Sequence, residues 1–191
     1  MTAARLLRRG LVLESITLGW NVVGVIVLAI AAIGARSVAL AGFGLDSLIE
    51  IGASTVVVWE LTGAGRDRER SALRLIGWSF LALSVYIAAQ GAYVLAVGHH
   101  PTHSSLGIAW TALTCVVMLA LAAGKRDTGH RLRNRVLLTE GRVTLVDAFL
   151  AAAVLIGLLL NAEAGWWWAD PLAGFVLVFY GVREGRAALR G

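Results

Sequence analysis

The hydrophobic positions of the chain fall into six blocks of about 20 residues, separated by short polar breaks rich in glycine and charge. The blocks cover residues 11–33, 37–61, 72–97, 104–123, 136–160 and 166–188. A bilayer core about 30 Å thick needs roughly 20 residues of helix, so each block is long enough to cross a membrane. The pattern predicts an all-α membrane protein: a single transmembrane domain over residues 1–191, built as a six-helix bundle with no soluble domain inserted or appended.

The composition agrees with this class. Hydrophobic residues make up 58% of the chain and charged residues 15%, whereas soluble domains have about 45–50% and about 25%. The apolar excess argues against a soluble enzyme, and we expect neither an enzymatic activity nor a prosthetic group. The one cysteine, Cys115, excludes a disulfide framework and thiolate metal clusters.

The basic residues collect on one side of the predicted membrane. Of the 17 lysines and arginines, Arg142 lies inside a predicted helix, fifteen fall on the side of the N-terminus and only Arg36 falls on the other side. The positive-inside rule therefore predicts that both termini are cytoplasmic. This asymmetry and attraction to anionic lipid explain the net charge of +5, so we expect no nucleic-acid partner. One lysine against sixteen arginines, with abundant alanine and glycine, indicates a GC-rich genome and hence a bacterial cytoplasmic membrane.

Four carboxylates lie within the predicted helices instead of at their ends: Asp46, Glu50, Glu140 and Asp147. A carboxylate at the centre of a membrane helix costs roughly 2.5–3.5 kcal/mol, and such residues mark functional sites by default. Glu50 and Asp147 fall close to the middle of two antiparallel helices. Asp46 is four residues from Glu50 and shares its helix face.

Neighbouring polar residues extend this predicted site. Glu140, Thr144 and Asp147 share one helix face, with Glu140 about 10 Å nearer the cytoplasm than Asp147 at 1.5 Å per residue. Asn21, near the middle of the first helix, adds an amide at the same depth. We therefore predict a metal site formed by Asp46, Glu50 and Asp147, with auxiliaries as follows: Glu140, Asn21 and Thr144.

Converging carboxylates repel one another unless a cation or protons neutralise them. Such a site binds a divalent cation as it loses protons and releases the cation as it regains them, which is the chemistry of a metal/proton antiporter. Two other interpretations remain open. The acids can pair with Arg142 or with backbone groups and only lock the helices together, or they can serve a proton or monovalent-cation carrier.

Three stretches resemble the cation diffusion facilitator (CDF) family of transporters. SVALAGFGLDSLIEIGAS is similar to the second helix of that family, where Asp46 and Glu50 fall on the two acidic positions of a D-x-x-x-D motif. LLTEGRVTLVDAFLAAAVLIG is similar to the fifth helix, where Asp147 falls on the metal-binding aspartate, and WWWADPLAGFVLVFYGVREG is similar to the sixth. The resemblance implies the transmembrane domain of a cation efflux transporter, and we expect the C-terminal cytosolic domain of the family to be missing.

The chain departs from the family pattern in its expected ligands. Zinc-type members carry H-x-x-x-D on the fifth helix, and Val143 stands at the histidine position. An all-oxygen site favours harder ions such as Mn²⁺ or Fe²⁺, although zinc also accepts carboxylates, so the cargo is expected among Mn, Fe, Zn and Co. The lost histidine equally suits a non-transporting membrane protein that kept the fold and binds or regulates a partner.

Two further features are open to a functional interpretation. His99, His100 and His103 form a cluster that can bind a transition metal or simply be solvated in a loop. Gly181 and Gly185 have the spacing of a close helix contact, which suggests a homodimer through the transmembrane helices or packing within one chain.

Overall fold

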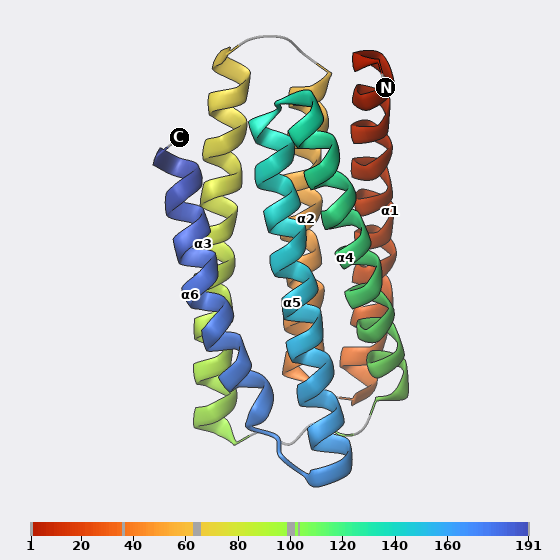
Figure 1. Ribbon diagram of the computed structural model, residues 1–191. Helices are drawn as coiled ribbons and strands as arrows, with labels where there is room; N and C mark the ends of the chain where they lie inside the picture. Colours follow the sequence, from red (N-terminus) through yellow and green to blue (C-terminus); the bar gives the residue numbers. More distant parts are fainter. Residues whose placement is uncertain (1, 36, 63–65, 99–101, 103, 191) are drawn as a thin grey trace.

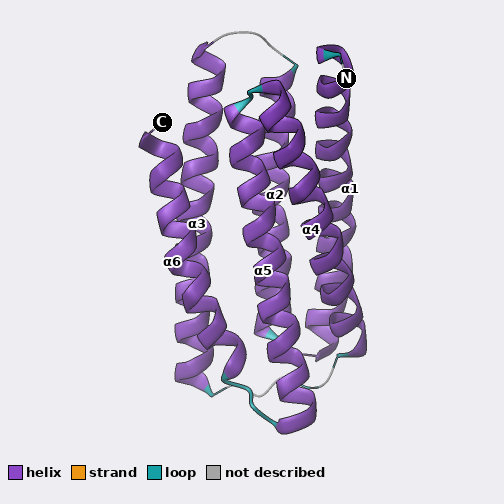
Figure 2. Cartoon of the chain, viewed as in Figure 1, coloured by secondary structure: helices purple, strands orange, loops and turns teal. Residues whose placement is uncertain are grey.

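The computed structural model describes residues 2–35, 37–62, 66–98, 102 and 104–190, and within these ranges the regular structure is entirely helical (Figures 1 and 2). The helices, in chain order, are α1 (Ala3–Ala35), α2 (Val38–Leu61), α3 (Arg66–Val97), α4 (Ser105–Leu132), α5 (Arg135–Ala164) and α6 (Ala169–Arg190). The predicted all-α class is therefore confirmed for the described part of the chain.

The helices run up and down in one elongated bundle with α5 near its centre. α1 packs along α2, α4 along α5 and α3 along α6, while α5 also contacts α2, α3 and α6. The start of α1, the end of α2, the start of α3, the α4–α5 connection and the end of α6 lie at one end of the bundle (Figure 1). We call this end the arginine end because the N-terminal arginines belong to it, as do the arginines in and beside the α4–α5 turn, residues 131, 133 and 135.

Five of these helices are long and apolar enough to cross a membrane, judged over the described residues: α1 to α5. α6 was expected as a sixth span but is not among them. Its second half carries Arg183, Glu184 and Arg186, and these charges shorten its apolar stretch. The side of the membrane on which the termini lie stays a prediction.

Several helix boundaries extend beyond the apolar blocks, most clearly in α4. The charged segment after Ala123 was expected to be a loop, but α4 continues to Leu132 and the turn falls at Arg133 and Asn134. Gly124 does not break the helix because it allows close packing: a Cβ there would lie 3.1 Å from a methyl group of Leu13 on α1. The charged residues after Ala123 therefore belong to a helix, where some are buried and others are at the surface, and they do not form a loop.

The glycines of α6 face another helix of the same chain. A Cβ on Gly185 would lie 3.0 Å from the carbonyl oxygen of Gly77 and 3.0 Å from Cβ of Phe80, and a Cβ on Gly181 would collide with the hydroxyl of Ser84. Both glycines are buried against α3. Of the two interpretations that the sequence left open, these glycines serve packing within one chain, between α3 and α6, and a homodimer stays a prediction.

Candidate functional site

All six residues predicted as metal ligands lie inside the bundle. No side chain among them is more than 3% exposed: Asn21, Asp46, Glu50, Glu140, Thr144 and Asp147. They project from α1, α2 and α5, the helices from which the sequence predicted convergence. Burying a charged group is costly unless it is paired and hydrogen-bonded, so the partners of each carboxylate determine what the site can do.

Asp46 on α2 and Asp147 on α5 face one another. Their carboxyl groups lie close enough to form a hydrogen bond when one of them carries a proton. Oδ2 of Asp46 and both carboxylate oxygens of Asp147 receive no hydrogen bond from the described residues. Buried oxygens without a donor are rare in folded proteins, so this aspartate pair is suited to hold a proton or a cation.

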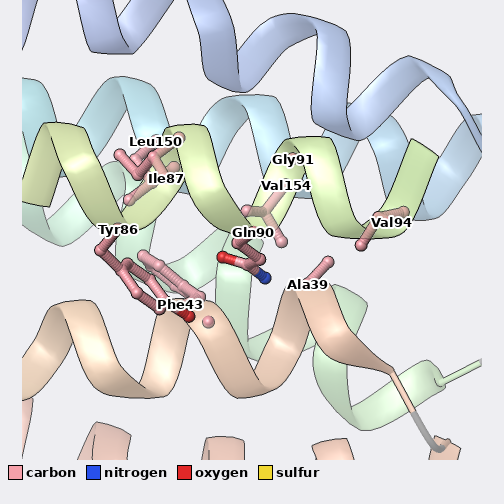
Figure 3. A pocket seen from close by; sticks show the side chains of 10 residues that line it. Ala39, Phe43, Tyr86, Ile87, Gln90, Gly91, Val94, Leu150 and Val154 are labelled. Carbon is pink, nitrogen blue, oxygen red and sulfur yellow. The ribbon is translucent and has the colours of Figure 1, made fainter. Parts of the chain in front are cut away.

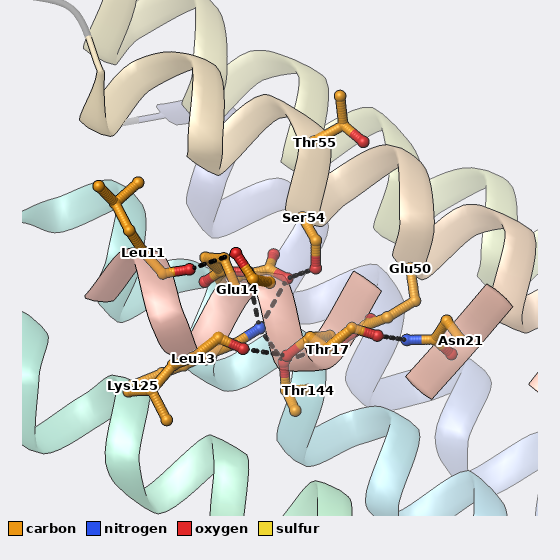
Figure 4. A network of polar contacts seen from close by, with 12 residues as sticks. Leu11, Leu13, Glu14, Thr17, Asn21, Glu50, Ser54, Thr55, Lys125 and Thr144 are labelled. Carbon is orange, nitrogen blue, oxygen red and sulfur yellow. Dashed lines mark hydrogen bonds and ion pairs between the residues drawn. The ribbon is translucent and has the colours of Figure 1, made fainter. Parts of the chain in front are cut away.

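A lysine occupies the neighbouring part of the interior. The Nζ of Lys125, on α4, lies 3.0 Å from Oε2 of Glu14 and 3.2 Å from Oε1 of Glu140, with all three side chains fully buried. Lys125 also donates a hydrogen bond of 2.9 Å to Oγ1 of Thr144. Figure 4 shows the ammonium between α1 and α5, with its contacts directed to both helices.

Two hydroxyl groups connect this lysine to α2. Thr144 donates a hydrogen bond of 2.9 Å to Oε1 of Glu50, and Ser54 donates one of 3.2 Å to Oε1 of Glu140 (Figure 4). Thr144 therefore accepts a hydrogen bond from an ammonium group and donates one to a carboxylate. The network joins α1, α2, α4 and α5 without a break.

The sequence reasoning missed two members of this network, Glu14 and Lys125. Lys125 falls in the polar break between the predicted helices 104–123 and 136–160, and Glu14 lies near the start of the first apolar block. A signal was present for Glu14: its offsets of three from Thr17 and seven from Asn21 place all three residues on one helix face. Arg142, one possible partner for the acids in the sequence, is exposed, whereas Lys125 is buried and pairs with Glu14 and Glu140.

The buried charges do not balance. Five carboxylates and one ammonium group are at most 3% exposed within the described part of the chain: Glu14, Asp46, Glu50, Glu140, Asp147 and Lys125. If all were ionised, the formal sum would be 1 − 5 = −4. Like charges at short range in a medium of low dielectric constant cannot all persist, so protons or added cations must neutralise most of this excess.

The described residues do not form a closed metal shell. They contain no group of three or more His, Cys, Asp or Glu side chains arranged to hold a metal ion. The Asp46–Asp147 pair supplies two carboxylates, and Glu50 is bonded to Thr144 instead. The amide of Asn21 donates a hydrogen bond of 3.0 Å to the carbonyl oxygen of Thr17, which ties it to its own helix. A cation at the aspartate pair would gain its third carboxylate if Glu50 left Thr144.

The remaining sequence candidates fall outside this network. Val143 is 5% exposed and belongs to an apolar cluster with Val57 and Ile76, so residue 143 lies at the boundary of the polar interior. His99, His100 and His103 lie outside the described residues.

A small cavity of about 30 Å³ lies between α2, α3 and α5 (Figure 3). Tyr86 and Gln90 supply its polar groups, and Phe43 and Leu150 are among its apolar walls. The phenol of Tyr86 is an electrostatic neighbour of Asp46. A cavity needs about 10–15 Å³ to hold a water molecule, so this one has room for water.

The helices and their hydropathy define the class: a multi-pass integral membrane protein. No family model matches the chain. The chain is similar to transmembrane protein 163 from Xenopus laevis, with 25% identity over 151 residues that cover 74% of this chain and 54% of the relative. It thus spans about half the length of this curated relative, and the similarity agrees with a membrane location.

Proposed function

We propose that the protein exports a divalent transition-metal cation across the membrane in exchange for protons, through the carboxylates of α2 and α5. The observation that carries the proposal is the buried Asp46–Asp147 pair, in which Oδ2 of Asp46 and both carboxylate oxygens of Asp147 lack donors among the described residues. Glu50 is one helical turn away on the same helix as Asp46. The CDF resemblance of these same positions supplies the direction of transport and the cargo class.

The exchange follows from charge. Protonation removes the negative charge of the two aspartates and so allows them to stay buried between two helices. A divalent cation that replaces the protons neutralises the same negative charge. Carboxylate oxygens are ligands for Mn²⁺ and Fe²⁺ and are accepted by Zn²⁺. Glu50 joins the cation as it leaves the hydroxyl of Thr144, so loading the site alters the contact between α2 and α5. Rocking of helices about a site at mid-depth would then open it to either side.

The test is metal-dependent proton movement in vesicles that contain the purified protein and a trapped pH indicator. Mn²⁺, Fe²⁺, Co²⁺, Zn²⁺ and Cd²⁺ are added in turn. At least one should drive proton flux in the parent protein, and Asp147→Asn should abolish it because the neutral amide cannot exchange a proton for a cation. Asp127→Asn is the matched control: Asp127 is paired with Arg9 and Arg131 at the arginine end, away from the site, and this variant should retain the flux.

Two other results of this flux assay would favour a different function. Proton flux that needs no divalent metal but requires Asp147 would favour a proton or monovalent-cation carrier. Absence of flux with all five metals, from correctly folded protein, would contradict transport and favour a partner-binding or regulatory membrane protein.

A further inference from the structure

The surroundings of Lys125 have the form of an occupied cation site. An ammonium group has three hydrogens to donate, and Nζ has three oxygen neighbours: Glu14 at 3.0 Å, Glu140 at 3.2 Å and Thr144 at 2.9 Å. The group is 0% exposed, so these oxygens replace its hydration. We call the oxygen-bearing side chains around it the Lys125 cage: Glu14, Glu50, Ser54, Glu140 and Thr144.

The cage offers more oxygen than the lysine uses. Both carboxylate oxygens of Glu14 and Oε2 of Glu140 are buried and receive no hydrogen bond from the described residues, so the contact of Lys125 with Oε2 of Glu14 is an ion pair without hydrogen-bond geometry. Glu50 reaches the ammonium only through the hydroxyl of Thr144. Carboxylates and hydroxyls are hard oxygen ligands, the kind that Mn²⁺, Mg²⁺ and Ca²⁺ accept, although with the lysine in place the three carboxylates are not gathered around one metal position.

We propose that the Lys125 cage is a second cation site, separate from the Asp46–Asp147 pair, and that the tethered ammonium of Lys125 is its resident cation. The lysine side chain is attached to α4 and cannot diffuse away. Its ammonium group therefore excludes inorganic cations in solution from the cage. A divalent ion placed among the same oxygens would lie within a few ångströms of the ammonium and be repelled by it. Lys125 thereby limits inorganic cations to the aspartate pair.

The sharpest test compares proteins whose cages carry the same formal charge. The double variant Lys125→Gln/Glu14→Gln removes one positive and one negative charge, so the cage keeps the sum of the parent, which is 1 − 3 = −2. The probe is Mn²⁺, counted per chain by equilibrium dialysis of purified protein in detergent. The double variant should bind one more Mn²⁺ than the parent, because the oxygens of Glu140, Thr144 and Ser54 become available to it.

Two further measurements separate this site from the aspartate pair and from general charge effects. Adding Asp147→Asn to the double variant should leave the extra Mn²⁺ in place, since the cage does not use Asp147, even if the transport proposal fails. Arg126→Gln should bind no extra Mn²⁺, because Arg126 is exposed beside the buried lysine. Lys125→Gln alone should also gain one Mn²⁺, and its melting temperature should rise when Mn²⁺ is added.

The proposal is overturned if the folded double variant binds no more Mn²⁺ than the parent. It is also overturned if the extra Mn²⁺ is lost with Asp147→Asn, since the ion would then belong to the aspartate pair. The double variant gives the deciding measurement, because it avoids the uncompensated carboxylate that Lys125→Gln leaves in the interior.

Discussion

Thr144 joins the two charged parts of the interior, so its hydroxyl should contribute strongly to stability. It accepts a hydrogen bond of 2.9 Å from Lys125 and donates one of 2.9 Å to Glu50. Thr144→Val preserves the shape of the side chain and removes both bonds. Bonds to charged groups contribute about 1.5–3 kcal/mol each in soluble proteins, whereas those between membrane helices average about 0.6 and reach about 1.7 kcal/mol. Since both partners here are charged, we take about 1.5 kcal/mol for each and expect a loss of about 3 kcal/mol.

The matched control is Thr111→Val. Thr111 is as buried as Thr144, at 0% exposed, but its hydroxyl donates to carbonyl oxygens of its own helix, at Gly107 and Ile108. Those carbonyls keep their helical partners, so the change should cost less than about 1 kcal/mol. The assay is reversible unfolding in mixed micelles at rising SDS fraction, followed by circular dichroism. Thr144→Ser should recover most of the stability. Equal losses for the two valine variants would refute the bridging role of Thr144.

Two other predictions follow from single positions. Val143→His places an imidazole four residues from Asp147 and should raise affinity for Zn²⁺ relative to Mn²⁺ in calorimetric titrations; an unchanged ratio would mean that residue 143 does not reach the cation. Gly185→Ala should destabilise the protein, because its Cβ would lie 3.0 Å from the Gly77 carbonyl, whereas Gly19→Ala, with nothing within 4 Å, should stabilise it by up to about 1 kcal/mol. Melting temperatures that fall equally for both would contradict the α3–α6 contact.

Hydropathy predicted the helices well but not where α4 ends. It averages over all faces of a helix, so a run of charged residues looks like a loop. In the structure the three charges after Gly124 point in different directions: Lys125 into the bundle, Arg126 outward, and Asp127 to Arg9 on α1 at 2.7 Å. A helix can carry adjacent charged residues when each side chain points to a different neighbour or to the outside. A hydropathy profile contains no information on these directions.

The acids of the site were predictable because the cost of burying them is so high. Asp46, Glu50 and Asp147 stand out against apolar neighbours, and their depths along antiparallel helices follow from counting residues. Their partners were harder to predict. Lys125 lies near a helix end, where a basic residue usually marks the cytoplasmic side, and only the packing of α4 against α5 turns it inward. The role of these residues as metal ligands stays a prediction.

The polar contacts divide the bundle into two parts with different mechanical properties. Charge-assisted bonds tie α1, α2, α4 and α5 together through Lys125 and Thr144. The contact between α3 and α6 is instead made through small residues, with Gly185 against Gly77 and Gly181 against Ser84. Directional bonds between charged groups resist displacement, whereas a surface of small residues has few such bonds to break. We therefore expect a change of charge at α2 and α5 to rearrange contacts among the four charged helices. Any larger displacement should occur between them and the α3–α6 pair, since that movement disrupts the fewest polar contacts and is of the kind that alternating access requires.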